Sequence, residues 1–203
     1  MAHTDPYSPP QASLGGLTPS EQADLDSGAL RYSGFWQRIG AYLIDFLILS
    51  PLIALDYMWG GETRMYQVYA FIPAQMLSVF LYIYMVVKFG GTPGKLLLGM
   101  RIVKLDGSPV TVREAALRYG VLWLLTIVMA AMMINAAMGM TDQEYTSLGY
   151  LTRSAALSAR APGLLVVTSL MQLWVLGCFI AILANRKRRT LHDFIAGTVV
   201  VRK

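Results

Sequence analysis

The stretch "FWQRIGAYLIDFLILSPLIAL", from Phe35 to Leu55, decides the class of fold because it is long and apolar enough to cross a membrane. A membrane-spanning helix needs about 20 predominantly apolar residues. Two charged residues interrupt the pattern, Arg38 near its start and Asp45 in its interior. A charge inside hydrocarbon costs at least about 2.5–3.5 kcal/mol, so both side chains are expected to face other protein or a water-filled cavity.

The composition of the whole chain is that of a membrane protein. Of its 203 residues, 55% are hydrophobic and only 14% are charged, whereas soluble domains carry about 25% charged residues. Spans of sufficient length lie at about 39–59, 66–87, 119–139 and 163–184. We therefore expect an all-α transmembrane fold, a four-helix bundle within the lipid bilayer with interfacial helices beside it.

Lysines and arginines are distributed unevenly among the segments outside the spans. Segments 1–38, 88–118 and 185–203 contain fourteen of them, whereas segments 60–65 and 140–162 contain three. Because basic residues accumulate on the cytoplasmic side of membrane proteins, both termini and the middle loop are expected in the cytoplasm. This distribution accounts for the net charge of +5, so we expect no binding of nucleic acid.

The remaining composition predicts neither a catalytic nor a metal site. Residues 1–32 are polar and predict a disordered cytoplasmic tail without a signal peptide, followed by a membrane domain at 33–203. A solitary Cys178 excludes an internal disulfide and a cysteine metal cluster. With only His3 and His192 besides, no nucleophile and base are paired, and we expect no enzyme activity, metal or cofactor.

Polar residues recur within the spans at helical spacing. Arg38, Asp45 and Asp56 lie seven and eleven residues apart, which is close to whole turns, so they share one face of the first helix. Such residues either join helices through hydrogen bonds or line a hydrophilic pathway, and both interpretations stay open. The further candidates of this kind are Gln75, Ser78 and Gln172.

The loop "KFGGTPGKLLLGMRIVKLDGSPVTVREAALRYG", residues 88–120, predicts a compact turn at the membrane surface. Its glycines allow a sharp change of direction, and Lys95 is expected to face anionic lipid headgroups. The loop is not a nucleotide-binding loop, because Phe89 stands where the first glycine is needed and Leu96 follows the lysine. The residues assigned to the turn and interface are Gly90, Gly91, Pro93, Gly94 and Lys95.

Two segments on the expected cytoplasmic side have the character of β-strands. These are "RIVKL" at 101–105 and "TVVVR" at 198–202. A lone strand leaves its backbone groups unpaired, so we expect the two to form a small cytoplasmic β-hairpin or sheet, with Ile102 and Val103 opposite 199–201.

Two capping boxes predict helix starts. "TVRE" at 111–114 opens a helix that runs into the third span, and "TDQE" at 141–144 opens a short helix in the external segment 140–162.

Three segments together resemble the RDD family of small bacterial membrane proteins: "GFWQRIGAYLIDFLI", "GGTPGKLLLGMRIVKLDGSP" and "RRTLHDFIAGTVVVRK". The resemblance covers about residues 33–203. The family is named for one arginine and two aspartates, which match Arg38, Asp45 and Asp193. It implies a multi-pass domain of the cytoplasmic (inner) membrane of a bacterium, without a settled activity, for which transport has been suggested.

These three residues are expected to form one charged network. Asp193 lies just beyond the fourth span, at the depth of Arg38, and is therefore the natural partner of that arginine. One guanidinium between two carboxylates leaves one negative charge, and desolvation then favours protonation of the deeper Asp45. His192 either joins the network or is solvated.

Two functions are compatible with such a network. One is a transporter or cation/proton exchanger, in which Asp45 alternately binds a proton and a small cation or substrate while Arg38 and Asp193 control access. The other is a non-transporting accessory or docking module in which the network is structural. The small size and the lack of an inverted repeat disfavour transport, unless the protein forms a homo-oligomer. The depth of Asp45 disfavours a purely structural role.

Overall fold

The computed structural model describes residues 31–202, so the predicted tail at 1–32 lies almost wholly outside the described residues. In this part of the chain, four helical segments are long and apolar enough to cross a membrane: Phe35–Trp59, Tyr66–Leu97, Val112–Met138 and Leu164–Ala184. The predicted transmembrane four-helix fold with a small sheet is confirmed. The elements are α2 (Phe35–Trp59), α3 (Tyr66–Val79), the π-helical η1 (Phe80–Tyr84), α4 (Met85–Phe89), α5 (Pro93–Leu97), β1 (Met100–Lys104), α6 (Val112–Met138), α7 (Asp142–Ser147), α8 (Tyr150–Arg160), α9 (Leu164–Ala184), α10 (Leu191–Ala196) and β2 (Thr198–Arg202).

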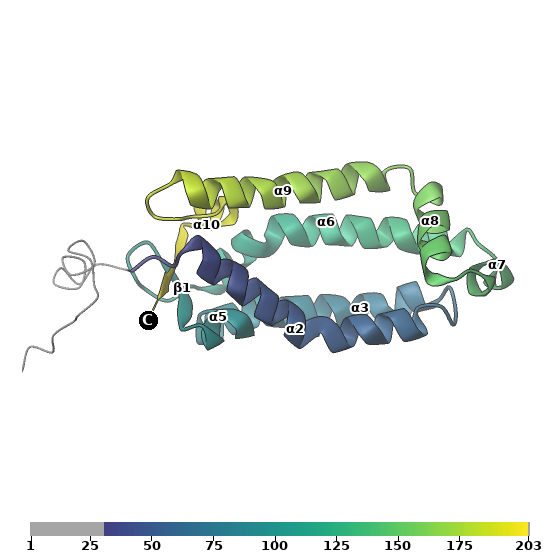
Figure 1. Cartoon of the computed structure of the whole chain (residues 1–203), viewed down its shortest axis with the longest axis horizontal. Helices are drawn as coiled ribbons and strands as arrows, with labels where there is room; N and C mark the ends of the chain where they lie inside the picture. The colour runs from purple at the N-terminus through teal and green to yellow at the C-terminus, as the bar shows by residue number, and fades with distance from the viewer. Residues whose placement is uncertain (1–30, 203) are drawn as a thin grey trace, which may run out of the picture. The chain divides into compact units, whose positions relative to one another are not determined.

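The short elements gather at the two ends of the bundle (Figure 1). Helices α2, α3, α6 and α9 run along one direction, and α7 and α8 lie at one end of them. Helices α5 and α10 lie with the sheet at the other end, which we call the sheet end. The sheet end is formed by the loop at 88–118 and the C-terminal segment at 185–203, both of which are expected from the sequence to be cytoplasmic.

Helix α2 begins at Phe35, earlier than the apolar run alone indicates, so it includes Arg38 in its first turn. The Oε1 atom of Gln37 accepts a hydrogen bond from the backbone N–H of Gly34 at 3.0 Å and thereby caps the helix start. Pro51 lies inside the helix and has no N–H to donate to the carbonyl of Leu47. The hydroxyl of Ser50 donates to that carbonyl at 2.8 Å, so the backbone group freed by the proline has a partner within the span.

The second span changes its winding in the middle. Between α3 and α4 the chain forms five π-helical residues, Phe80–Tyr84. This wider turn carries Tyr82, whose ring stacks on that of Tyr119 in α6 with centroids 4.6 Å apart. Helix α4 then ends at Gly90, whose φ of +85° is a left-handed conformation that suits glycine.

Helix α5 packs against α2 at very short range because Gly94 has no side chain. A Cβ atom at this position would collide with the carbonyl oxygen of Ala41 in α2. The same approach lets the backbone N–H of Gly94 donate to Oδ1 of Asp45 at 2.7 Å. The predicted turn therefore docks on the first span rather than only covering its end.

The predicted cytoplasmic strands pair as an antiparallel sheet. Ile102 lies opposite Val200 and Val103 lies opposite Val199, as the sequence analysis expected. The side chains of Val199 and Val200 are fully buried, so the sheet is part of the core at the sheet end and not a surface ribbon.

Both predicted capping boxes start helices. Glu114 accepts from the backbone N–H of Thr111 at 2.8 Å, and α6 continues without a break to Met138. At the opposite end, Thr141 accepts from the N–H of Glu144 at 3.1 Å and starts α7. The segment predicted to hold one short helix holds two, because α8 follows α7 directly.

The close packing of α5 on α2 can be tested with Gly94→Ala. Overpacking a well-packed site costs about 1–3 kcal/mol, so we expect a markedly lower melting temperature of the purified protein in detergent, or failure to fold. Gly120→Ala in α6 is the matched control, since a Cβ there meets no atom within 4 Å. Its melting temperature should be unchanged or slightly higher. Equal melting temperatures for the two variants would contradict this packing.

Candidate functional site

The carboxylate of Asp193 is held at the start of α10, where the sequence "TLHD" forms a capping box. Thr190 is the N-cap, and its backbone N–H and hydroxyl donate to Oδ2 of Asp193 at 3.0 and 2.7 Å. The N–H of Asp193 in turn donates to the hydroxyl of Thr190 at 3.3 Å. The local sequence therefore fixes the orientation of the carboxylate before any distant residue contacts it.

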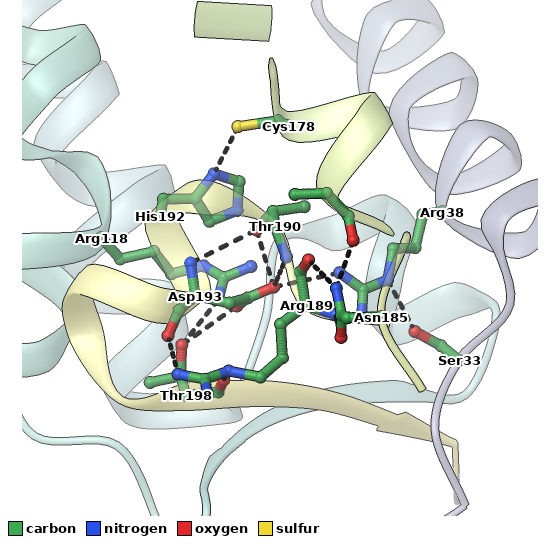
Figure 2. A network of polar contacts seen from close by, with 11 residues as sticks. Ser33, Arg38, Arg118, Cys178, Asn185, Arg189, Thr190, His192, Asp193 and Thr198 are labelled. Carbon is green, nitrogen blue, oxygen red and sulfur yellow. Dashed lines mark hydrogen bonds and ion pairs between the residues drawn. The ribbon is translucent and has the colours of Figure 1, made fainter. Parts of the chain in front are cut away.

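Two arginines from distant parts of the chain neutralise this carboxylate (Figure 2). Nη1 of Arg38 lies 3.1 Å from Oδ2 of Asp193, and Nη1 of Arg118 pairs with Oδ1. Asp193 has no exposed surface and Arg38 is 2% exposed. The hydroxyl of Thr198 donates to Oδ1 at 3.0 Å and accepts from Arg118 at 2.9 Å. We call these residues the Asp193 network: Arg38, Arg118, Thr190, Asp193 and Thr198.

A second layer of polar contacts surrounds the network. Nε of Arg38 donates to the hydroxyl of Ser33 at 3.0 Å, while its Nη2 is buried without a hydrogen-bond partner in the described part of the chain. Arg189 donates to the backbone carbonyls of Asp193 and Thr198 at 2.8 and 3.2 Å. Burial lowers the pKa of Arg189. Arg189, the last of four consecutive basic residues at 186–189 after α9, is thus part of the folded structure (Figure 2).

The structure does not place Asp45 in this network, which corrects the predicted trio of Arg38, Asp45 and Asp193. Asp45 accepts from the hydroxyl of Thr92 at 2.6 Å and from the backbone N–H of Gly94. It lies seven residues after Arg38, roughly 10 Å further along the helix at about 1.5 Å per residue. The start of α5 supplies the partners of Asp45. In the network, Arg118 stands where Asp45 was expected. Instead of one guanidinium between two carboxylates, the network has one carboxylate between two guanidiniums.

Lys95 was expected to face the lipid headgroups. In the structure it lies inside the bundle instead. Its side chain is 4% exposed. Its Nζ donates to the hydroxyl of Thr92 at 3.3 Å and lies 4.7 Å from the centroid of the Tyr42 ring. The expectation was wrong because Gly94 docks on α2, which turns the next residue inward. Among the described residues, no carboxylate forms an ion pair with Lys95.

The other predicted polar residues have separate environments. Gln75 accepts from Nε1 of Trp123 at 2.7 Å and so joins α3 to α6. Ser78 lines a cavity. Asp56 and Gln172 are exposed on the surfaces of α2 and α9. The four residues do not form one continuous polar pathway.

A cavity of about 360 Å³ lies next to the Asp193 network, and we call it the bundle cavity. It is lined by residues of α2, the second span, α5 and its N-cap, β1, α6, α9 and α10, and Arg118 belongs both to its wall and to the network. Its polar lining residues are Tyr42, Ser78, Tyr82, Thr92, Lys95, Arg118, Tyr119, Thr126 and His192. Arg118 was not among the residues predicted from the sequence, although it directly precedes the third apolar run as Arg38 precedes the first.

His192 points away from the carboxylate beside it in the sequence. Its Nδ1 lies 3.5 Å from Sγ of the buried Cys178 (Figure 2). Its ring lines the bundle cavity. Burial holds the pKa of His192 well below its ordinary value, and the positive charges of Arg118, Lys95 and Arg38 lower that pKa further. The imidazole is therefore neutral at pH 7. Within residues 31–202, no three His, Cys, Asp or Glu side chains are placed to hold a metal ion.

The stoichiometry of the network predicts an order of stability among its variants. Removing one arginine leaves Asp193 paired with the other, whereas Asp193→Asn leaves two guanidiniums without a counter-charge. Breaking a buried ion pair typically costs about 3–5 kcal/mol. We expect Asp193→Asn to lower the melting temperature in detergent more than Arg38→Gln or Arg118→Gln does. The exposed Arg113→Gln in α6 is the control. An Asp193→Asn protein as stable as the control would refute the assignment.

Comparison with known proteins agrees with the three motif segments. The model of the RDD family matches residues 32–197. The protein YckC of Bacillus subtilis (strain 168), described as uncharacterized, is 26% identical over 169 residues, which cover 83% of each chain. No solved structure matches. The family match contains all four candidate membrane spans of the described chain and both partners of the Arg38–Asp193 ion pair, and the chain belongs to the RDD family.

Proposed function

We propose that the protein moves a solute across the inner membrane of a bacterium, with the bundle cavity as the solute site. The single observation that carries this proposal is the cavity itself, a space of about 360 Å³ lined by polar and charged groups among membrane-spanning helices. Sites for small molecules have volumes of about 300–1,000 Å³. Ionisable groups inside a membrane bundle are costly, and they typically mark substrate or ion pathways.

The winding of the second span also favours this site. Tyr82 lines the cavity from the π-helical segment η1. Single π-helical turns are rare and occur frequently at functional sites, because they cost regular hydrogen bonding and re-aim side chains. Here the extra width of the helix brings Tyr82 against Tyr119, which also lines the cavity.

In this proposal the Asp193 network is structural and holds the sheet end together. Both oxygens of Asp193 already have partners, so this carboxylate is not available to carry an ion. Asp45 is likewise held by two donors at the start of α5. A cation/proton exchanger that uses Asp45 would have to break both hydrogen bonds in each cycle. The geometry therefore favours the cavity over Asp45 as the place where a solute binds.

A non-transporting accessory or docking module is the second candidate. The bonding of both Asp193 oxygens favours it, because a carboxylate with no free oxygen holds structural elements together and is not available to a solute. The two functions differ in one measurable property, which is solute flux through the purified protein. Neither requires catalysis, a cofactor or a metal, and we propose none.

The proposed orientation places the sheet end in the cytoplasm. Cysteine substitutions at two exposed positions test it in a Cys178→Ala background: Asp106, in the turn after β1, and Thr146, in α7. With a membrane-impermeant maleimide, we expect Thr146→Cys to be labelled in whole spheroplasts and Asp106→Cys only after permeabilisation. Labelling of Asp106→Cys in intact spheroplasts would reverse the orientation.

Filling the cavity tests the transport proposal. Thr126 lines the cavity, whereas Leu124, two residues earlier in α6, is 62% exposed on the outer surface. In proteoliposomes containing pH- and cation-sensitive dyes, under imposed gradients of sodium, potassium or phosphate, we expect flux through the wild type and Leu124→Trp. Flux through Thr126→Trp should fall to the level of protein-free vesicles.

The wild type also provides the decisive negative result. If it produces no flux under any of these gradients at several pH values, transport is rejected and the accessory module stands. Equal flux through Thr126→Trp and Leu124→Trp would retain transport but exclude the bundle cavity as its route.

A further inference from the structure

We infer that the bundle cavity binds a phosphate-type oxyanion, held by Lys95 and Arg118. The inference rests on the proposed function only in taking the cavity as the ligand site, and it names the chemical class of the ligand.

The first argument is the balance of charge around the cavity. Three basic side chains, Arg38, Arg118 and Lys95, lie near two carboxylates, Asp45 and Asp193. The neighbouring imidazole is neutral. When Lys95 is protonated, the cluster carries one surplus positive charge on side chains that are largely buried, where an uncompensated charge is costly. A bound anion compensates it, whereas a cation would add to it.

The second argument is that Lys95 lacks an anionic partner. Its ammonium group has three N–H donors, yet its polar contacts are one hydrogen bond of 3.3 Å to Thr92 and the face of the Tyr42 ring. Thr92 already donates its hydroxyl hydrogen to Asp45. No carboxylate in the described part of the chain lies within ion-pair distance of Nζ. A buried ammonium group is ordinarily paired, so an anionic ligand is the partner expected for the protonated Lys95.

The third argument concerns the free side of Arg118. Its hydrogen bonds to Asp193 and Thr198 both run through Nη1. Within residues 31–202, Nε and Nη2 have no hydrogen-bond partner, and the side chain lines the cavity. A guanidinium presents its N–H groups in a plane that matches two oxygens of a phosphate or carboxylate. Arg118 can therefore hold Asp193 with one nitrogen and an oxyanion with the other two.

The remaining lining groups suit a tetrahedral oxyanion in particular. The hydroxyls of Ser78 and Tyr82 belong to the cavity wall, together with neutral His192. These groups are able to donate to oxygens that the two cations do not reach. The cations that lower the pKa of His192 would be screened by a bound anion. The phosphate group could belong to a dissolved phosphate compound or to a phospholipid, and the two sources are separable by experiment.

Lys95→Met tests the inference, because methionine has a similar length and no charge. The matched control is Lys88→Met, since Lys88 is exposed at the end of α4. Melting temperatures are measured in a non-ionic detergent with increasing sodium phosphate, against sodium chloride at equal ionic strength. A ligand that binds the native state raises stability by RT ln(1 + [L]/Kd). We expect phosphate to raise the melting temperature of the wild type and Lys88→Met, while Lys95→Met binds at least about tenfold more weakly, as loss of a charged hydrogen bond implies.

The ligand-free melting temperature gives an independent result. If Lys95 is an unpaired buried charge, Lys95→Met should be as stable as the wild type or more stable in the absence of phosphate. A less stable or unfolded Lys95→Met would mean that the lysine already has its partner within the chain, and would overturn the inference. Equal responses to chloride and phosphate would overturn a dissolved phosphate ligand and leave the lipid headgroup, which the nanodisc experiment tests.

Lipid nanodiscs identify the source of the phosphate group. Nanodiscs of phosphatidylcholine alone, whose headgroup is zwitterionic, are the baseline for both arms. One arm adds inorganic phosphate to them, and the other adds the anionic phosphatidylglycerol without inorganic phosphate. A stabilisation that depends on Lys95 in the first arm supports a dissolved ligand, and one confined to the second arm supports a lipid headgroup. No such stabilisation in either arm overturns the inference. Binding without flux would reject transport alone, and flux without binding would reject the oxyanion alone.

Discussion

A carboxylate with no exposed surface has lost all its hydration, and the groups that replace that water determine which parts of the chain must meet. At Asp193 those groups are two guanidiniums, from the first and third membrane-spanning helices, and hydroxyls on either side of α10. The contact therefore joins α2, α6, α10 and β2 at a single point (Figure 2). Removing one partner of such a cluster leaves an uncompensated charge, so the elements at the sheet end depend on one another.

The same contact gives the neighbouring cavity its electrostatic character. Because two guanidiniums share one carboxylate, the network is positive overall, and Arg118 carries this charge to the cavity wall. Asp45 positions the part of the cavity wall that α5 contributes. By binding the first turn of α5 it holds that helix against α2, and the lysine that follows Gly94 then has no route to the surface. The two family aspartates thus have different partners, and each positions a different cation at the cavity.

Features that follow from local periodicity could be predicted from the sequence. The spans follow from the length of the apolar runs, and the register of the sheet follows from alternation in two short segments. The Arg38–Asp193 contact follows from depth, since both residues lie at the same end of their helices. The partners of Asp45 and Lys95 could not be predicted, because they depend on how closely two backbones approach. In the sequence, only the glycine at position 94 indicates that α5 and α2 approach closely. Which residues of α2 it contacts can be seen only in the structure.

The packing of α5 also explains the role of the segment "GGTPGK", residues 90–95, which does not form a nucleotide-binding loop. In a phosphate-binding loop, backbone N–H groups surround the anion. In this chain the N–H of Gly94 is directed to the carboxylate of Asp45, so the protein itself supplies the anion at that position. The backbone is thereby used for folding, and only the ammonium of Lys95 remains directed inward. Any affinity of the cavity for an anion must then come from side-chain charges, whose attraction for an anion is stronger where burial lowers the local dielectric constant.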